Sequence, residues 1–218
     1  MLSEYDVIII GGGGSGLAAA VRALENGARV LVLEKQPQLG GTTGMAIGSF
    51  TANGTSLQRA AGVIDSADAH EEDAGKFAAP EIESHSNNEL RRFFLGQTAE
   101  TLEWLRGMGL YFHGPNPEPP NRVPRMHNIV PNAKAYIAAF QTQILKRNGT
   151  IVCDAPVVEL VSDGQQVTGV VALIQGERKT ITAKRGVVLA AGDYANAPEI
   201  IGRFKGDQFK SIEGVNPK

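Results

Sequence analysis

The chain has 218 residues, 42% of them hydrophobic and 20% charged, which is typical of a globular protein with an apolar core. The formal net charge of −2 and the lack of any cluster of Lys and Arg argue against a nucleic-acid partner. Cys153 is the only cysteine, so an internal disulfide and a cysteine-rich metal site are excluded, and we expect a reducing compartment, by default the cytoplasm. The sequence contains no run of about 18 apolar residues, so we expect no membrane span.

The first part of the chain predicts a strand, a helix and a second strand. Residues 5–10 are β-branched and apolar, which is typical of a strand buried on both faces of a parallel sheet. Residues 15–26 repeat apolar side chains every three or four positions, which predicts one buried helix face, and Gly27 follows as a stop signal. Residues 29–33 form a second apolar run that Glu34 closes. This βαβ unit predicts a parallel sheet with a right-handed connection.

The middle of the chain predicts surface segments and two helices. Residues 65–85 are polar and charged, which indicates a surface excursion. Residues 86–89 form a capping box, with Ser86 as the cap, and predict one long helix. Five prolines make residues 113–124 an extended loop, and Asn132 is a candidate cap for the next helix. The long helix is expected to bury an apolar stripe made of Leu90, Phe93, Phe94, Thr98, Leu102, Trp104 and Leu105.

The last third changes to short strands. The runs are separated by turn signals at 163–164 and 176–177 and predict a β-meander inserted in the α/β framework. They cover residues 150–153, 156–162, 167–175 and 180–183. Residues 186–192 then predict a buried strand that meets another glycine turn. The expected fold is α/β with a mostly parallel sheet.

A glycine-rich turn follows the first strand. Gly11, Gly13 and Gly16 satisfy G-x-G-x-x-G, in which the first permits a tight turn, the second lets the backbone approach a pyrophosphate, and the third lets the helix lie close to the sheet. The helix N-terminus would offer free N–H groups to phosphate. Glu34 would accept hydrogen bonds from both adenosine ribose hydroxyls and would repel a 2′-phosphate. The alternative is a glycine turn with a solvated Glu.

A second glycine pair distinguishes between two dinucleotides. NAD and FAD are both compatible with the first turn. Residues 39–43, which contain Gly40, Gly41, Thr42 and Thr43, favour FAD, because the longer cofactor needs a second backbone approach near its diphosphate and flavin ends. An ordinary glycine turn is the alternative.

With these motifs the sequence resembles the fumarate reductase/succinate dehydrogenase flavoprotein superfamily, which also contains the 3-ketosteroid dehydrogenases. The resemblance covers nearly the whole chain and rests on residues 6–16, 34–35, 40–43, 103–105 and 187–192. It implies a Rossmann-like FAD-binding domain over residues 1–218. This domain would be incomplete relative to the family, because the capping domain and the C-terminal flavin-covering segment are absent.

The resemblance also implies which residues bind FAD. Ala46, Gly48 and Ser49 are expected near the N5 edge of the isoalloxazine, and the strand at Val157 near the adenine. The full implied set is Gly11, Gly13, Gly14, Ser15, Gly16, Glu34, Lys35, Gly40, Gly41, Thr42, Thr43, Ala46, Gly48, Ser49, Val157, Ala191 and Gly192.

Other features leave alternatives. Asp193 stands where the family has a glycine beside the diphosphate, so we expect it to point outward or the turn to be displaced. Residues 70–73 (H-E-E-D) lack zinc-ligand spacing and read as a solvated charged face rather than a metal site. Arg122, Arg125 and His127 could serve an anionic substrate or the flavin, and surface salt bridges are an equal alternative. No catalytic residue is assigned.

The resemblance implies an oxidoreductase that transfers hydride between flavin N5 and an activated C–C bond of a small acid or ketone. Family members continue beyond this length, and their acid/base residues lie mostly in the later parts. Two hypotheses therefore stay open. The chain is part of an enzyme, completed by further sequence or by a second chain, or it is a non-catalytic FAD-binding subunit. The substrate is not readable from the sequence.

Overall fold

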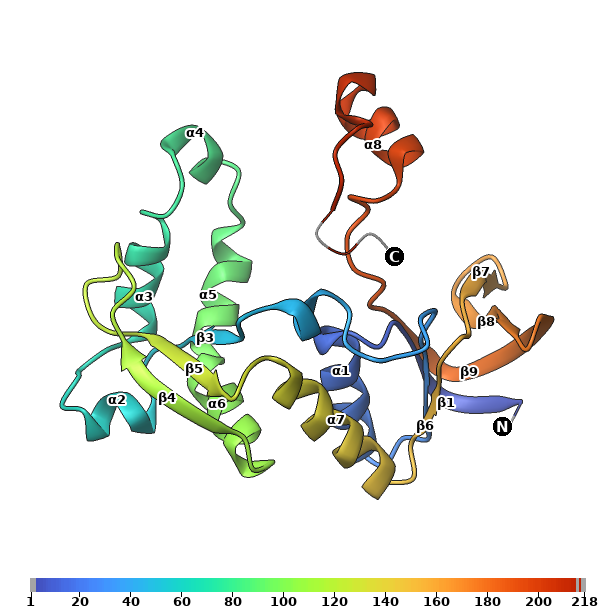
Figure 1. The fold of residues 1–218 in the computed structure, drawn as a ribbon, viewed down its shortest axis with the longest axis horizontal. Coiled ribbons are helices and arrows are strands. Elements are labelled where there is room, and N and C mark those ends of the chain that lie inside the picture. Colours follow the sequence, from blue (N-terminus) through green and yellow to red (C-terminus); the bar gives the residue numbers. More distant parts are fainter. Residues whose placement is uncertain (1–2, 215, 217–218) are drawn as a thin grey trace. The chain divides into compact units, whose positions relative to one another are not determined.

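The computed structural model describes residues 3–214 and 216, and the chain forms two compact units, whose elements are labelled in Figure 1. Unit 1 comprises Met1–Ala46 and Tyr136–Lys218, and unit 2 comprises Ile47–Ala135. Unit 2 is therefore inserted in the sequence between the two parts of unit 1. The assignment of residues 1–218 to one FAD-binding domain stays a prediction.

Unit 1 is built on a six-stranded sheet with the order β6-β2-β1-β9-β8-β7. β1 pairs in parallel with β2 and β9, and β2 with β6, whereas β7, β8 and β9 are antiparallel neighbours. Ile8, Ile9, Leu31 and Val32 are fully buried, because both faces of these central strands are covered. The predicted mostly parallel α/β sheet is confirmed. Its strands are β1 (Glu4–Ile10), β2 (Val30–Leu33), β6 (Thr150–Val152), β7 (Val157–Ser162), β8 (Val167–Ile174) and β9 (Glu177–Leu189).

Helix α1 (Gly14–Glu25) packs on β1, β2 and β9, and buries the predicted apolar face. Leu17 and Val21 on this face are 0% exposed, and burial of such a side chain stabilises the fold by roughly 1.5–3 kcal/mol. The helix ends at Asn26 and Gly27, whose φ of 76° suits glycine. The other helical segments of unit 1 are η1 (Thr42–Met45), α7 (Lys134–Lys146), α8 (Pro198–Lys205) and η2 (Asp207–Phe209).

Strand β9 joins two runs that the sequence predicts as separate strands. Its first part pairs with β8, and its second part pairs with β1. The register with β1 shifts between the Tyr5–Ala183 and Val7–Gly186 pairs, and Gly186 has a φ of 148°. A glycine lets the strand continue through this irregularity. The meander and the parallel sheet therefore share one continuous strand. The meander consists of β7, β8 and the first part of β9, so the assignment of residues 150–153 to it is wrong, because β6 pairs in parallel with β2.

Unit 2 combines a three-stranded antiparallel sheet, in the order β3-β5-β4, with short helices. Phe50 and Phe112 make an edge-to-face contact across the sheet, with ring centroids 6.4 Å apart. The strands are β3 (Ser49–Thr51), β4 (Tyr111–Asn116) and β5 (Met126–Val130). The helices are α2 (Ser56–Ala60), α3 (Ala67–Ala74), α4 (Pro80–Glu83), α5 (Asn88–Gly96) and α6 (Thr98–Gly107).

The single long helix predicted from residue 86 is wrong, because the chain forms α5 and α6 with a break at Gln97. The carbonyl of Leu95 accepts from Asn53 Nδ2 at 2.8 Å and from Thr98 Oγ1 at 3.0 Å, and such side-chain donors compete with the helical ladder. The cap is Asn87, whose side chain accepts from the Leu90 N–H, rather than Ser86.

The break also changes which side chains are buried. Leu102 and Leu105 are in the core as predicted, and Trp104 is half-buried. Leu90, Phe93 and Phe94 on α5 are 62%, 68% and 61% exposed, so their assignment to the buried stripe is wrong. The 3.6-residue pattern does not continue across Gln97, and the two helices therefore do not present one common face.

Candidate functional site

A cleft of about 550 Å³ opens in unit 1 at the carboxyl ends of β1, β2 and β9. Residues that directly follow each of these strands line it, including Gly11, Glu34 and Ala190. Parallel strands bring such residues to one edge of the sheet, which is where ligands bind in open α/β folds. The volume is in the range of small-molecule and cofactor sites.

The turn after β1 requires glycine at positions 11 and 16. Gly11 has a φ of 107°, and a Cβ there would lie 2.3 Å from the carbonyl oxygen of Ala190. A Cβ on Gly16 would lie 2.0 Å from the oxygen of Gly11. The turn is held by backbone bonds, from the Gly11 N–H to Leu33 O and from the Ala190 N–H to Ile10 O, both 2.8 Å. Three strands and a helix therefore meet without side chains between them.

The N-terminus of α1 faces this cleft, and its N-cap residue is a glycine. Gly13 has no side chain that could cap the helix, and the Gly14 N–H donates to Thr43 Oγ1 at 3.2 Å. A Cβ on Gly13 would meet no atom nearer than 4.0 Å, so the absent side chain leaves open space in the cleft. Exposed N–H groups and the positive end of the helix dipole favour an anion at this position.

The second glycine pair packs against the first turn. The Gly40 N–H donates to Gly12 O at 2.9 Å, and Gly13 and Gly40 form an isolated bridge. Thr43 Oγ1 accepts from the Gly14 N–H at 3.2 Å, and a Cβ on Gly14 would lie only 2.7 Å from it. The two glycine segments therefore form one continuous wall of backbone, to which an extended ligand can lie close.

Glu34 is fixed at the edge of the cleft. Its side chain is 7% exposed, and its Oε2 accepts from the Gly12 N–H at 2.6 Å while Oε1 accepts from the Gln36 N–H at 2.8 Å. The alternative of a freely solvated Glu is therefore wrong. Each carboxylate oxygen has a second lone pair, so both can still accept from ligand hydroxyls.

The cleft brings together most of the predicted cofactor residues. Those that line it are Gly11, Gly13, Gly14, Ser15, Glu34, Lys35, Gly41, Thr42, Thr43, Ala191 and Gly192. Gly16 and Gly40 lie behind them as supports. Four others are not in its lining: Ala46 ends η1, Gly48 and Ser49 belong to unit 2, and Val157 begins β7. Contact of any of these residues with a cofactor stays a prediction.

The sequence prediction assigned only the start of the wall that follows β9, with Ala191 and Gly192. The lining residues outside the predicted set are Gln36, which follows β2, and Ala190, Asp193, Tyr194, Ala195, Asn196, Ala197, Glu213, Gly214 and Asn216. Their position after the carboxyl end of a central strand was the available signal. Asp193 was expected to point outward or to sit on a displaced turn. It is one of the residues that line the cleft, and its Oδ1 accepts from the Ala195 N–H at 2.8 Å, while the orientation toward a diphosphate stays a prediction.

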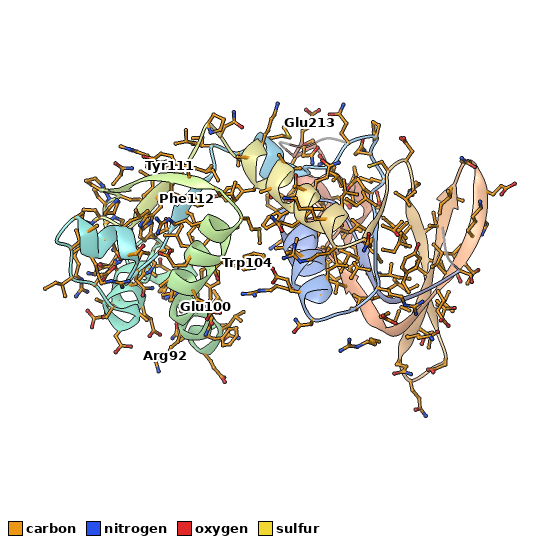
Figure 2. All side chains as sticks on the ribbon, turned by 90° about the horizontal axis from the view of Figure 1, so that it is seen from below. Arg92, Glu100, Trp104, Tyr111, Phe112 and Glu213 are labelled. Carbon is orange, nitrogen blue, oxygen red and sulfur yellow. The ribbon has the colours of Figure 1, made fainter. Side chains whose placement is uncertain are left out.

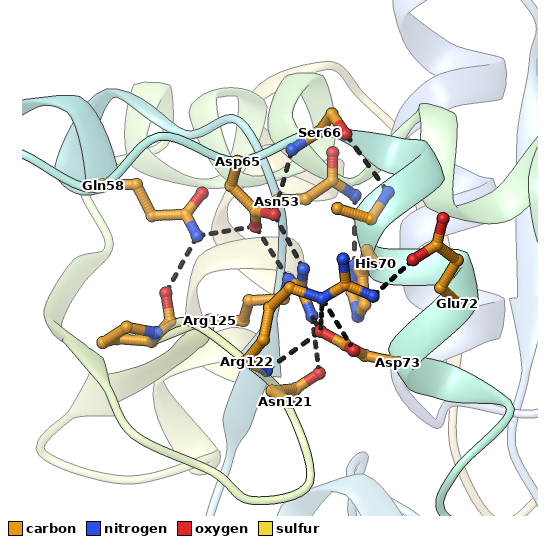
Figure 3. A network of polar contacts seen from close by, with 12 residues as sticks. Asn53, Gln58, Asp65, Ser66, His70, Glu72, Asp73, Asn121, Arg122 and Arg125 are labelled. Atoms are coloured by element: carbon orange, nitrogen blue, oxygen red, sulfur yellow. Dashed lines mark hydrogen bonds and ion pairs between the residues drawn. The ribbon is translucent and has the colours of Figure 1, made fainter.

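Unit 2 holds a separate buried polar network (Figure 3). Arg125 is 0% exposed and makes a bidentate ion pair with Asp65, with both N–O distances 2.7 Å. Its Nη1 also donates to Asp73 at 2.7 Å. Asp73 is 0% exposed and accepts from Arg122 and Lys76 as well. Burial alone would raise the pKa of Asp73, but these hydrogen bonds outweigh burial and hold the pKa well below its usual range.

This network corrects two expectations. Residues 65–85 are not a plain surface excursion, and His70 and Asp73 are buried rather than on a solvated charged face. Arg125 is a buried structural cation, not a surface one. His127 is also buried, with Nε2 3.0 Å from Thr55 Oγ1 and Nδ1 3.2 Å from Phe50 O, and burial lowers its pKa. These side chains are occupied by contacts within unit 2.

Residues 3–214 and 216 contain neither a candidate membrane span nor a candidate metal cluster. No helix in this part of the chain is long and apolar enough to cross a membrane. No group of three or more His, Cys, Asp or Glu side chains in it is arranged to hold a metal ion.

Comparison with known proteins identifies the relatives of this chain. NADH:fumarate oxidoreductase of Klebsiella pneumoniae is 28% identical over 208 residues, a match that covers 94% of this chain and 22% of that protein. Fumarate reductase (cytochrome) of Shewanella frigidimarina is 27% identical, with 91% and 35% covered. The chain therefore spans well under half the length of these relatives.

Solved structures of similar fold come from the same group of flavoproteins. The open conformation of a flavocytochrome c3 fumarate reductase superposes with a TM-score of 0.88 at 26% identity, covering 98% of this chain and 38% of that one. The 3-ketosteroid-Δ4-(5α)-dehydrogenase of Rhodococcus jostii RHA1 gives 0.80 at 27% identity, with 92% and 48% covered. The family model described as an FAD binding domain matches residues 6–211. FAD is the cofactor that these matches identify, and the chain belongs to the FAD-binding domain family of fumarate reductase- and dehydrogenase-type flavoproteins.

Proposed function

We propose that the cleft of unit 1 holds the ADP part of FAD, and that the protein uses the flavin in an oxidoreductase reaction. The observation that carries this proposal is the glycine turn at the N-terminus of α1, where the N-cap residue Gly13 has no side chain, with Glu34 fixed beside it. The diphosphate would lie against the backbone of Gly13 and Gly14, and Glu34 would accept from the ribose hydroxyls. Lys35 would face the phosphates as the basic group of the lining.

For the rest of the cofactor the proposal follows the resemblance. The isoalloxazine would lie near Ala46, Gly48 and Ser49, and the adenine near Val157. Bound FAD supplies hydride transfer with an activated C–C bond of a small acid or ketone. The residues of this chain would bind and orient the cofactor, and the groups that select the substrate and move its proton would come from outside residues 1–218, from further sequence or a second chain. The single cysteine favours a reducing compartment such as the cytoplasm.

The decisive experiment compares flavin content. The purified wild-type chain should carry FAD, and Glu34→Ala should lower the affinity about 10-fold or more, because it removes both the ribose acceptor and the partner of the Gly12 N–H. Glu177→Ala is the matched control, since it removes an equal charge from a side chain that is 75% exposed on the β8–β9 hairpin. Full flavin content in Glu34→Ala would contradict the ribose contact.

A second candidate is a non-catalytic FAD-binding subunit that holds cofactor for a partner. A yellow protein that is inert toward fumarate, ketosteroids and artificial electron acceptors would agree with it. Turnover by the chain alone would refute it.

A further inference from the structure

The cleft carries more negative than positive charge. Among its described lining residues the acidic ones are Glu34, Asp193 and Glu213, and the basic one is Lys35. Glu34 has a place in the proposed function, opposite the ribose. Asp193 and Glu213 have none, although both are exposed and border the space where a diphosphate would lie; Figure 2 labels Glu213.

Both carboxylates stand on a wall that begins next to the glycine turn. The carbonyl of Ala190 occupies the place that a Cβ on Gly11 would need, so Ala190 directly adjoins the turn. Asp193 is three residues further along, and three residues span at most about 10 Å. This reach is about one Debye length at 0.1 M salt, so the charge of Asp193 acts on an anion at the turn.

Local hydrogen bonds hold the two acidic residues on this wall. Asp193 Oδ1 accepts from the Ala195 N–H at 2.8 Å, which ties the carboxylate to its own turn. Asn196 Oδ1 accepts from the Gly214 N–H at 2.9 Å, which keeps Glu213 beside the segment that carries Asp193. Within residues 3–214 and 216, neither Asp193 nor Glu213 forms an ion pair, so no cation in this part of the chain neutralises their charges.

We propose that Asp193 and Glu213 determine how tightly the cleft holds its anionic cofactor. The N-terminus of α1 and Lys35 attract the diphosphate, and the two carboxylates oppose this attraction. The inference rests on the proposed function and refines it: the cleft discriminates against negative charge on its ligand, and the discrimination weakens as ionic strength rises. FAD would therefore be held more loosely than the glycine cradle alone would allow.

The test measures FAD and adenosine binding to the full chain by titration calorimetry. The variants are Asp193→Asn and Glu213→Gln, and the control is Glu177→Gln, which makes the same charge change at a side chain that is 75% exposed on the β8–β9 hairpin and outside the lining. Each cleft variant should tighten FAD binding about two- to five-fold at low salt, the range for exposed charge interactions. The gain should disappear near 1 M NaCl, where the Debye length is about 3 Å.

Adenosine binding should not change in any variant, and FAD binding should not change in the Glu177→Gln control. An equal effect of all three substitutions, an effect on adenosine, or a gain that survives at about 1 M NaCl would overturn the inference while leaving FAD binding intact. Failure of every variant and of the wild type to bind FAD and adenosine would instead overturn the proposed function, and this inference with it.

Discussion

Replacing Arg125 with Met should destabilise unit 2 strongly, because it leaves two carboxylates buried with fewer partners. Arg125 is 0% exposed and supplies three of the charged hydrogen bonds to Asp65 and Asp73. Breaking a buried ion pair by removing one partner costs about 3–5 kcal/mol. Asp73 keeps Arg122 and Lys76, so we expect a loss near the lower end, about 3 kcal/mol.

The assay is urea denaturation followed by tryptophan fluorescence. Trp104, labelled in Figure 2, is the only tryptophan and lies on α6, so its emission reports on unit 2. With a slope of about 2 kcal/mol per molar urea, a loss of about 3 kcal/mol moves the midpoint by about 1.5 M. Arg125→Lys should lose less, because it keeps the charge but not the bidentate geometry.

Arg178→Met is the matched control. Arg178 pairs with Glu159 at 2.8 Å, with side chains 60% and 56% exposed, and such a surface pair contributes about 0–1 kcal/mol. It lies in unit 1, so Trp104 emission should change little in this control, and far-UV circular dichroism follows unit 1 in parallel. If Arg125→Met moves the tryptophan transition no more than this control does, the network in Figure 3 does not stabilise unit 2.

Two further predictions concern the glycine turn and pH. Gly13→Val should fold normally but lose FAD binding, because its side chain would fill open space in the cleft. Gly16→Val should unfold the chain, because its Cβ would lie 2.0 Å from Gly11 O. Circular dichroism measures folding and flavin content measures binding, and loss of folding in both variants would refute the distinction. Burial lowers the pKa of His70 from 6.5 to about 4, so the unfolded chain binds more protons between these values. The stability due to neutral His70 is therefore complete above pH 6.5 and is lost as pH falls toward about 4. In His70→Gln the urea midpoint should depend less steeply on pH over this window than in the wild type. An unchanged dependence of the midpoint on pH would contradict this prediction.

The sequence was informative where structure depends on near neighbours. The strand, turn and helix of residues 4–25 follow from apolar periodicity and glycine spacing, and Glu34 follows from its position at the end of β2. These features obey short-range rules of sterics and hydrogen bonding, so one sequence is enough to predict them.

The sequence was uninformative where distant residues decide the outcome. The helix break at Gln97 depends on Asn53, which takes the Leu95 carbonyl from 42 positions away. Arg125 pairs with Asp65 and Asp73, which are 60 and 52 residues away in the sequence. Composition made all three look like surface charges, since only tertiary contacts distinguish a buried ion pair from an exposed one.

The continuity of β9 means that the outer hairpin controls the geometry of a site it does not touch. A Cβ on Gly169 in β8 would lie 2.4 Å from Ile181 O, so this close contact fixes how the hairpin pairs. A slip of one residue would move the end of the strand by about 3.3 Å and carry Ala190 away from Gly11. Substitutions that shift the register of the β8–β9 hairpin should therefore weaken FAD binding, as substitutions in the cleft itself would.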